Sequence, residues 1–95
     1  MLLSAMVVDR EFNSVSRCRV RNISDRGTKL DIPNSFLVPT GFWLIAVSSG
    51  LAYDAQLAWR RYPNLGVSLG EPIFLDPPTS SIGRQLRTVW INASN

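Results

Sequence analysis

The chain contains 95 residues, of which 45% are hydrophobic and 18% are charged. This length supports one small domain, and this composition excludes a disordered chain. One cysteine and no histidine exclude an intramolecular disulfide, a zinc site and every histidine-dependent catalytic mechanism. The sequence has neither a spanning apolar run nor the basic start of a signal peptide. We therefore expect a cytoplasmic protein that is not an enzyme, carries no metal or cofactor and does not bind a membrane.

Ten basic residues oppose seven acidic ones, which gives a formal charge of +3. Every basic residue except Lys29 is an arginine. The planar guanidinium suits bidentate recognition of phosphate or carboxylate groups. A net charge of this size is also ordinary for a protein surface, so it points to a site only where arginines cluster.

Turn-forming residues recur about every 8–12 residues, a spacing typical of an all-β sandwich or barrel. The segments between the turns are rich in β-branched and aromatic residues. They predict six strands, at about 2–9, 14–22, 27–32, 42–48, 52–60 and 65–69. Residues 42–47 are apolar on both faces, so this strand should be the most buried. Alternation in the next strand predicts an inner face; it contains Tyr53, Ala55, Leu57 and Trp59.

The pattern changes after Gly70. Three prolines predict a stiff, extended connection over residues 71–78, which would separate a barrel of residues 1–70 from a helix of residues 79–93. The helix has apolar residues at helical spacing, namely Ile82, Leu86, Val89, Trp90 and Ala93. This stripe should dock across one opening of the barrel or on a second subunit, so the chain is expected to be a monomer or a homodimer.

The second predicted strand carries Arg17, Arg19 and Arg21 in alternation with Cys18 and Val20. Side chains two residues apart share a face, so the three guanidiniums point the same way. At a rise of roughly 3.3 Å per residue, about 13 Å separate Arg17 from Arg21. This stripe either attracts a ligand with two phosphates or is a solvated face paired with carboxylates. Cys18 points the other way and is expected to be an inert core thiol.

A turn follows directly, with Asn22, Ser24, Arg26 and Gly27 in it or beside it. Asn and Ser side chains bond the local backbone in tight turns, and glycine permits a positive φ or a close backbone approach. The residues thus fit an ordinary β-turn. They also fit a turn that presents an amide, a hydroxyl and bare backbone to a ligand, with Arg21 and Arg26 as the nearest cations.

The order of these motifs resembles the PilZ domain family over nearly the whole chain. Residues 21–30 resemble the family motif Asp/Asn-x-Ser-x-x-Gly. Residues 58–69 resemble the closing hairpin of PilZ domains from α-proteobacteria, in which a Trp-Arg pair, a short turn and a Gly-Val strand recur. Residues 83–90 are similar to the helix that often follows.

The resemblance implies a six-stranded antiparallel β-barrel with a C-terminal helix. It also implies that the domain binds cyclic di-GMP, a bacterial second messenger. Residues Asn22, Ser24 and Gly27 would contact a guanine and its phosphate side. The ligand-binding set then comprises Asn22, Ser24, Gly27, Arg21, Arg26, Arg17 and Arg19. The family's Arg-x-x-x-Arg loop before the first strand has no counterpart in residues 1–95. We therefore expect weak or absent nucleotide binding by this chain.

Two alternatives remain open. One is a PilZ-like adaptor that binds no nucleotide and contacts a protein partner. The other is a small basic barrel that binds single-stranded nucleic acid, which requires exposed aromatic residues along a basic groove. The aromatic residues Trp43, Tyr53, Trp59 and Trp90 fall mostly at core spacing, which argues against nucleic acid.

Overall fold

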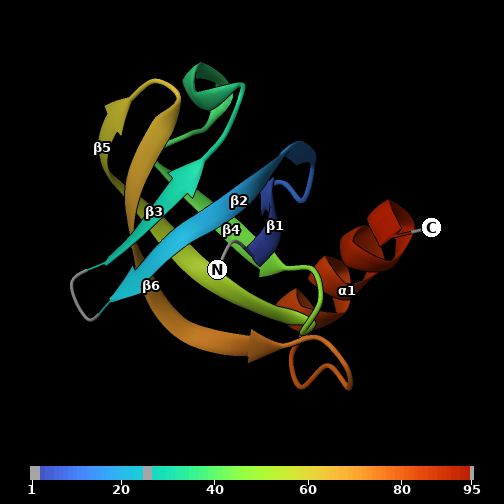
Figure 1. Ribbon diagram of the computed structural model, residues 1–95. Coiled ribbons are helices and arrows are strands. Elements are labelled where there is room, and N and C mark those ends of the chain that lie inside the picture. Colours follow the sequence, from blue (N-terminus) through green and yellow to red (C-terminus); the bar gives the residue numbers. More distant parts are fainter. Residues whose placement is uncertain (1–2, 25–26, 95) are drawn as a thin grey trace.

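The computed structural model describes residues 3–24 and 27–94 and consists of six strands and one α-helix (Figure 1). The strands are β1 (Leu3–Val8), β2 (Ser14–Ser24), β3 (Gly27–Asp31), β4 (Gly41–Ala46), β5 (Leu51–Arg61) and β6 (Asn64–Phe74). A short 3₁₀ turn, η1 (Ser35–Leu37), precedes β4, and α1 (Ser81–Ser94) ends the fold. The predicted mostly β architecture with a C-terminal helix is confirmed.

All strand pairs are antiparallel, and the sheet follows the order β1-β2-β3-β6-β5-β4. The first and last strands of this order also pair, with Val7 opposite Leu44. The six strands therefore close into a barrel, in which each strand has a neighbour on both sides over part of its length. The closed sheet has an inner face and an outer face.

The interior contains apolar side chains from all six strands and from the segment around η1. Its fully buried members include Val7, Leu30, Phe42, Ala55 and Leu65. Cys18 belongs to this interior, as predicted, and burial raises the pKa of its thiol from an ordinary 9.0 to about 12. Because side chains alternate along β2 and Cys18 points inward, the arginines of this strand lie on the outer face of the barrel.

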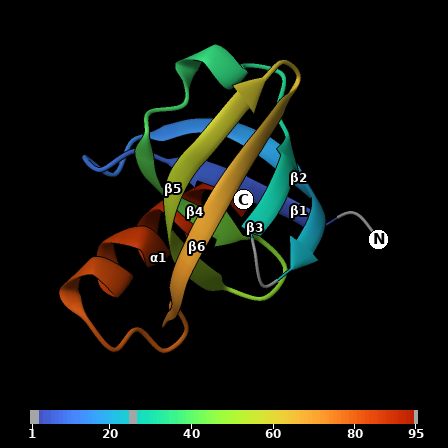
Figure 2. The same ribbon diagram turned by 90° about the vertical axis from the view of Figure 1, so that its left-hand side faces the viewer.

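A second apolar cluster lies outside the barrel, between the sheet and α1. Met6 and Val8 of β1 and Ile45 of β4 contribute to it, together with Leu86 of α1. Figures 1 and 2 show α1 along the outer side of the sheet, away from β3 and the β5–β6 hairpin. The helical stripe was expected at a barrel opening or on a second subunit. It instead covers the outer face of β1 and β4, because β4 is apolar on both sides and needs two covers.

Two details differ from the sequence prediction. Strand β6 runs on to Phe74 through Pro72, which faces Tyr53 of β5, so the strand continues into the segment predicted as a connection. Trp59 was predicted on the inner face of β5 but is 46% exposed. A bulge between Leu57 and Trp59 shifts the register by one residue, which moves every later side chain to the opposite face.

Candidate anion-binding face

The arginines of β2 lie on the outer face of the barrel, as the alternation predicts. Arg17, Arg19 and Arg21 are exposed, whereas Cys18 and Val20 between them are buried. The three arginines nevertheless have different surroundings, which determine which of them are available to a ligand.

Arg17 stabilises the packing of the helix. Its Nη2 donates a 2.6 Å hydrogen bond to the carbonyl oxygen of Ala93, in the last turn of α1. A cation at this position satisfies a carbonyl that the helix leaves without a partner and opposes the negative end of the helix dipole. The sequence did not predict this role, because 76 residues separate the two partners.

Arg21 and Arg19 remain on the open part of the sheet. Nη1 of Arg21 lies 2.9 Å from Oδ2 of Asp31 on β3, and the amide of Asn64 on β6 donates to the other oxygen of Asp31. Within the described chain, the side chain of Arg19 makes no hydrogen bond or ion pair, although its Cα faces that of Asp31 across the strands. Arg19 is thus the cation of β2 most available to an anion.

The turn after β2 places Gly27 in the left-handed region, with φ +145°. A Cβ atom there would lie 2.8 Å from the carbonyl oxygen of Val67 on β6, so glycine is required by both conformation and space. Asn22 and Ser24 belong to strand β2, but the structure does not describe their side chains. Arg26 lies outside the described residues altogether.

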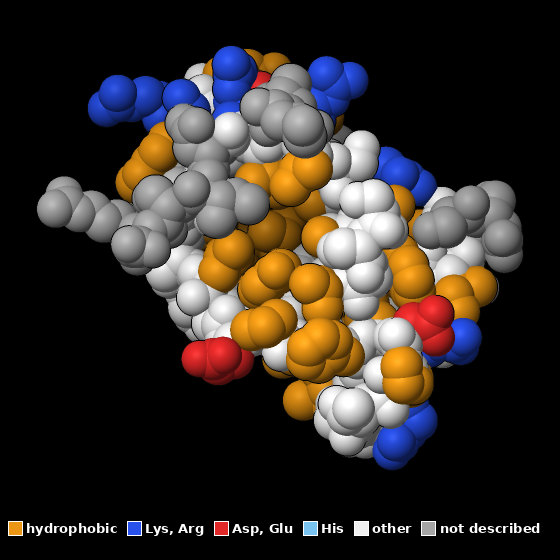
Figure 3. Space-filling model, turned by 60° about the horizontal axis from the view of Figure 1, so that its bottom comes forward, with side chains coloured by type: hydrophobic (Ala, Val, Ile, Leu, Met, Phe, Trp, Pro, Cys, Tyr) orange, Lys and Arg blue, Asp and Glu red, His pale blue; other side chains and the backbone are white. Residues whose placement is uncertain are grey.

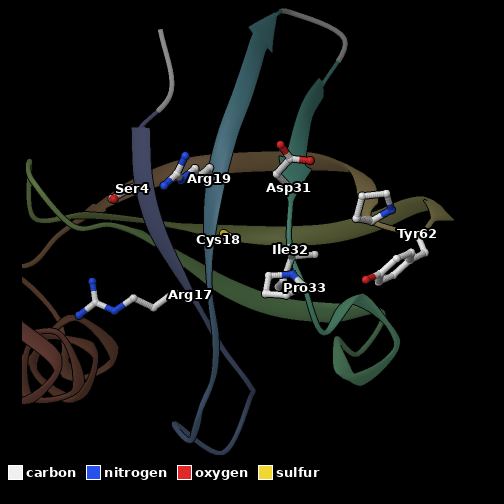
Figure 4. Close-up of a pocket in the computed structure, with 9 residues that line it drawn as sticks. Ser4, Arg17, Cys18, Arg19, Asp31, Ile32, Pro33 and Tyr62 are labelled. Atoms are coloured by element: carbon white, nitrogen blue, oxygen red, sulfur yellow. The ribbon is translucent and has the colours of Figure 1, made fainter.

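A surface hollow of about 580 Å³ lies beside the arginines of β2. Ser4, Arg19 and Asp31 form one part of its lining, and Pro33 and Tyr62 form another (Figure 4). Figure 4 shows Arg19 directed toward Ser4 and Arg17 directed toward the helix. The hollow therefore combines one available guanidinium with an exposed aromatic ring.

The outer face continues across β3 and β6 to the end of β5. Lys29 faces Gly66, and Gly66 faces Trp59, by the register of the strands. The indole of Trp59 occupies the space where Gly66 lacks a side chain. Arg61 of β5 faces Asn64 in the same way. We call the outward residues of this region the basic face: Arg19, Arg21, Lys29, Asp31, Trp59, Arg61, Asn64 and Gly66.

Sequence reasoning missed the contribution of β5 to this face. The alternating pattern of residues 52–60 carries no mark of the bulge that turns Trp59 outward. Gly66, on the polar side of β6 between Asn64 and Ser68, was the available indication, because glycine within a strand often marks a close approach by another group.

A second hollow, of about 160 Å³, lies at one open end of the barrel. Leu3, Val20, Leu44 and Leu69 line it, and Thr28 and Tyr53 supply hydroxyl groups. Figure 3 shows apolar side chains gathered on this end of the molecule. The hollow has no cation or carboxylate among its described lining residues, so it does not suit a charged nucleotide.

The described residues contain no group of three or more His, Cys, Asp or Glu side chains placed to hold a metal ion. In the same part of the chain, no helix is long and apolar enough to cross a membrane. The chemistry that this region offers is therefore that of guanidinium, ammonium, amide and aromatic groups, which suits noncovalent recognition of an anion.

Comparison with family models, with curated proteins and with solved structures finds no match to this chain.

Proposed function

We propose that this chain is a bacterial, cytoplasmic signalling module of the PilZ type, whose ligand site lies on the β2–β3 side of the barrel. The observation that carries the proposal is the turn between β2 and β3. The stretch that resembles the family's Asp/Asn-x-Ser-x-x-Gly motif joins the paired strands β2 and β3, and Gly27 has a positive φ where the motif has its glycine. The closed antiparallel sheet with a C-terminal helix agrees with the fold that the resemblance implies.

The proposed ligand is cyclic di-GMP, bound weakly. Of the three arginines of β2, Arg17 is engaged by α1 and Arg21 is shared with Asp31. Two charge-assisted hydrogen bonds, from Arg19 and Arg21, contribute roughly 3–6 kcal/mol in total. Contributions of this size correspond to dissociation constants from about 6 mM down to about 40 μM. The entropic cost of association favours the weak end of this range, and we expect about 1 mM.

Calorimetric titration with cyclic di-GMP tests the proposal. We expect a dissociation constant of about 1 mM, further weakened by Arg19→Gln and left unchanged by Arg84→Gln on the exposed side of α1. A low-micromolar constant that Arg21→Ala abolishes would show that the strand arginines suffice for tight binding. Equal heats for cyclic di-GMP and for GMP would contradict a site built for the cyclic dinucleotide.

A further inference from the structure

The basic face extends well beyond the β2–β3 turn, and its charge is unbalanced. It carries four cations and one carboxylate, Asp31, among the described residues. The described acids that lie elsewhere are Asp9, Glu11, Asp54, Glu71 and Asp76. The net positive charge of the described residues is thus concentrated on the side of the barrel that α1 leaves open.

Three cations of this face are available to a ligand. Within the described chain, the side chains of Arg19, Lys29 and Arg61 make no hydrogen bond or ion pair, and they lie on three different strands. Neighbouring strands are about 4.8 Å apart, so the four strands from β2 to β5 separate Arg19 from Arg61 by about 14 Å. Arg19 and Arg61 end one row across the strands, with Asp31 and Asn64 between them. Lys29 lies in the adjoining row, beside Gly66, so the cations span more than a single phosphate group needs.

Trp59 adds an aromatic surface to this row. Its ring lies against the backbone of Gly66, which fixes its orientation, and 46% of the residue remains exposed. Lys29 is the neighbour of Gly66 on the other side. Tyr62, in the turn between β5 and β6, is 70% exposed and lines the hollow that also contains Arg19. A large aromatic group held open beside cations is what base stacking requires.

We propose that the basic face binds single-stranded nucleic acid, with a base stacked on Trp59 and phosphates held by Arg19, Lys29 and Arg61. The sequence argued against this function because its large aromatic residues, Trp59 among them, fall mostly at core spacing, and the bulge of β5 removes that objection for Trp59. An acidic protein would satisfy the cations but would leave the aromatic surface unused. This proposal shares Arg19 with the proposed nucleotide site but does not rest on cyclic di-GMP binding, because Trp59 and Arg61 belong to β5, which contributes no residue to that site.

Fluorescence anisotropy with a labelled oligothymidylate of about 12 nucleotides, within the site sizes of such surfaces, tests the proposal. We expect binding at about 50 mM salt that weakens steeply toward 200 mM, as phosphate contacts release counterions. Trp59→Ala should weaken binding by about tenfold through the loss of one stacked base. Trp59→Phe should restore part of that loss, which separates stacking from a fault in folding.

Matched variants make the test specific. Lys29→Gln and Arg61→Gln should each lower the slope of log affinity against log salt by about 0.7. Arg84→Gln on the helix should leave the slope unchanged. Phe74→Ala removes an aromatic residue that is 55% exposed at the far end of β6 and should leave the affinity unchanged.

Three results would overturn the proposal. The first is no change in anisotropy at low salt with the native chain. The second is equal weakening by Trp59→Ala and Phe74→Ala, or by Arg61→Gln and Arg84→Gln. The third is competition by polyglutamate as effective as that by unlabelled oligothymidylate, which would assign the face to acidic proteins. Loss of oligonucleotide binding in Trp59→Ala with unchanged cyclic di-GMP binding would separate this function from the nucleotide site.

Discussion

The two sides of the barrel differ in what their outward residues are and in what covers them. On β1 and β4 the outward residues are apolar, including Met6, Val8 and Ile45, and α1 buries them. On β2 and β3 they are charged, including Arg19 and Lys29, and no helix or strand of the described residues lies over them (Figures 1 and 2). The helix-covered side therefore supplies stability, and the open side is the one available to a ligand.

The largest effect is expected on the covered side. Leu86 is fully buried between α1 and the sheet, so Leu86→Ala should lower the free energy of unfolding by about 2–5 kcal/mol. Gln85→Ala, at the exposed position next to it, is the matched control and should be nearly neutral. Urea unfolding measures both. Equal midpoints for the two variants would show that α1 does not contribute to the stability of the barrel.

A smaller loss is expected at the turn of the open side. Gly27→Ala puts a side chain into a left-handed conformation and against the carbonyl oxygen of Val67. The variant should lose about 1–3 kcal/mol of stability. Gly70→Ala is the control, because its added Cβ would meet no atom closer than 3.5 Å. Thermal unfolding that ranks Gly70→Ala below Gly27→Ala in stability would contradict the geometry of the turn.

The titration of Cys18 tests whether the barrel interior beneath the open side is buried. Its pKa is raised from 9.0 to about 12 by burial, so the unfolded chain loses the thiol proton at a lower pH than the folded chain does. Folding stability is unaffected below pH 9 and falls as the pH rises from 9 toward 12. Between pH 9 and 10 the native chain should lose about 1 kcal/mol more than Cys18→Ala does. Parallel alkaline curves for the two proteins would contradict the burial.

The smallest expected change in stability comes from substituting two arginines of the same strand, β2. Arg17→Gln removes the hydrogen bond to Ala93 and should cost about 1 kcal/mol of stability. Arg19→Gln removes no bond within the described chain and should cost less than about 0.5 kcal/mol. Chemical denaturation of both variants measures the difference. A larger loss for Arg19→Gln would reverse the assignment of Arg17 to the helix and Arg19 to a ligand.

The fold was predicted from the sequence more completely than the site was. Periodicity of two identified the strands, and periodicity near 3.6 identified the stripe around Leu86, because burial acts directly on these patterns. The place where α1 docks was not predictable, since the outer apolar residues of β1 and β4 come together only through strand pairing.

The residues that make up the basic face were harder to predict, because their exposure depends on tertiary packing and on strand register. The inward and outward alternation of Cys18 and Arg19 was read directly from residue types. The engagement of Arg17 by Ala93 depends on tertiary packing. The exposure of Trp59 depends on one bulge in β5, and a shift of one residue reverses every later assignment of faces.

We expect ligands to bind the open side of the barrel and to leave the helix-covered side unchanged. An NMR titration of the ¹⁵N-labelled chain with cyclic di-GMP tests this most directly, because chemical shifts report weak binding residue by residue. We expect concentration-dependent shifts at Arg19, Arg21 and Gly27, with the amides of α1 unmoved. Shifts confined to α1 and β4, with those three amides unchanged, would contradict it.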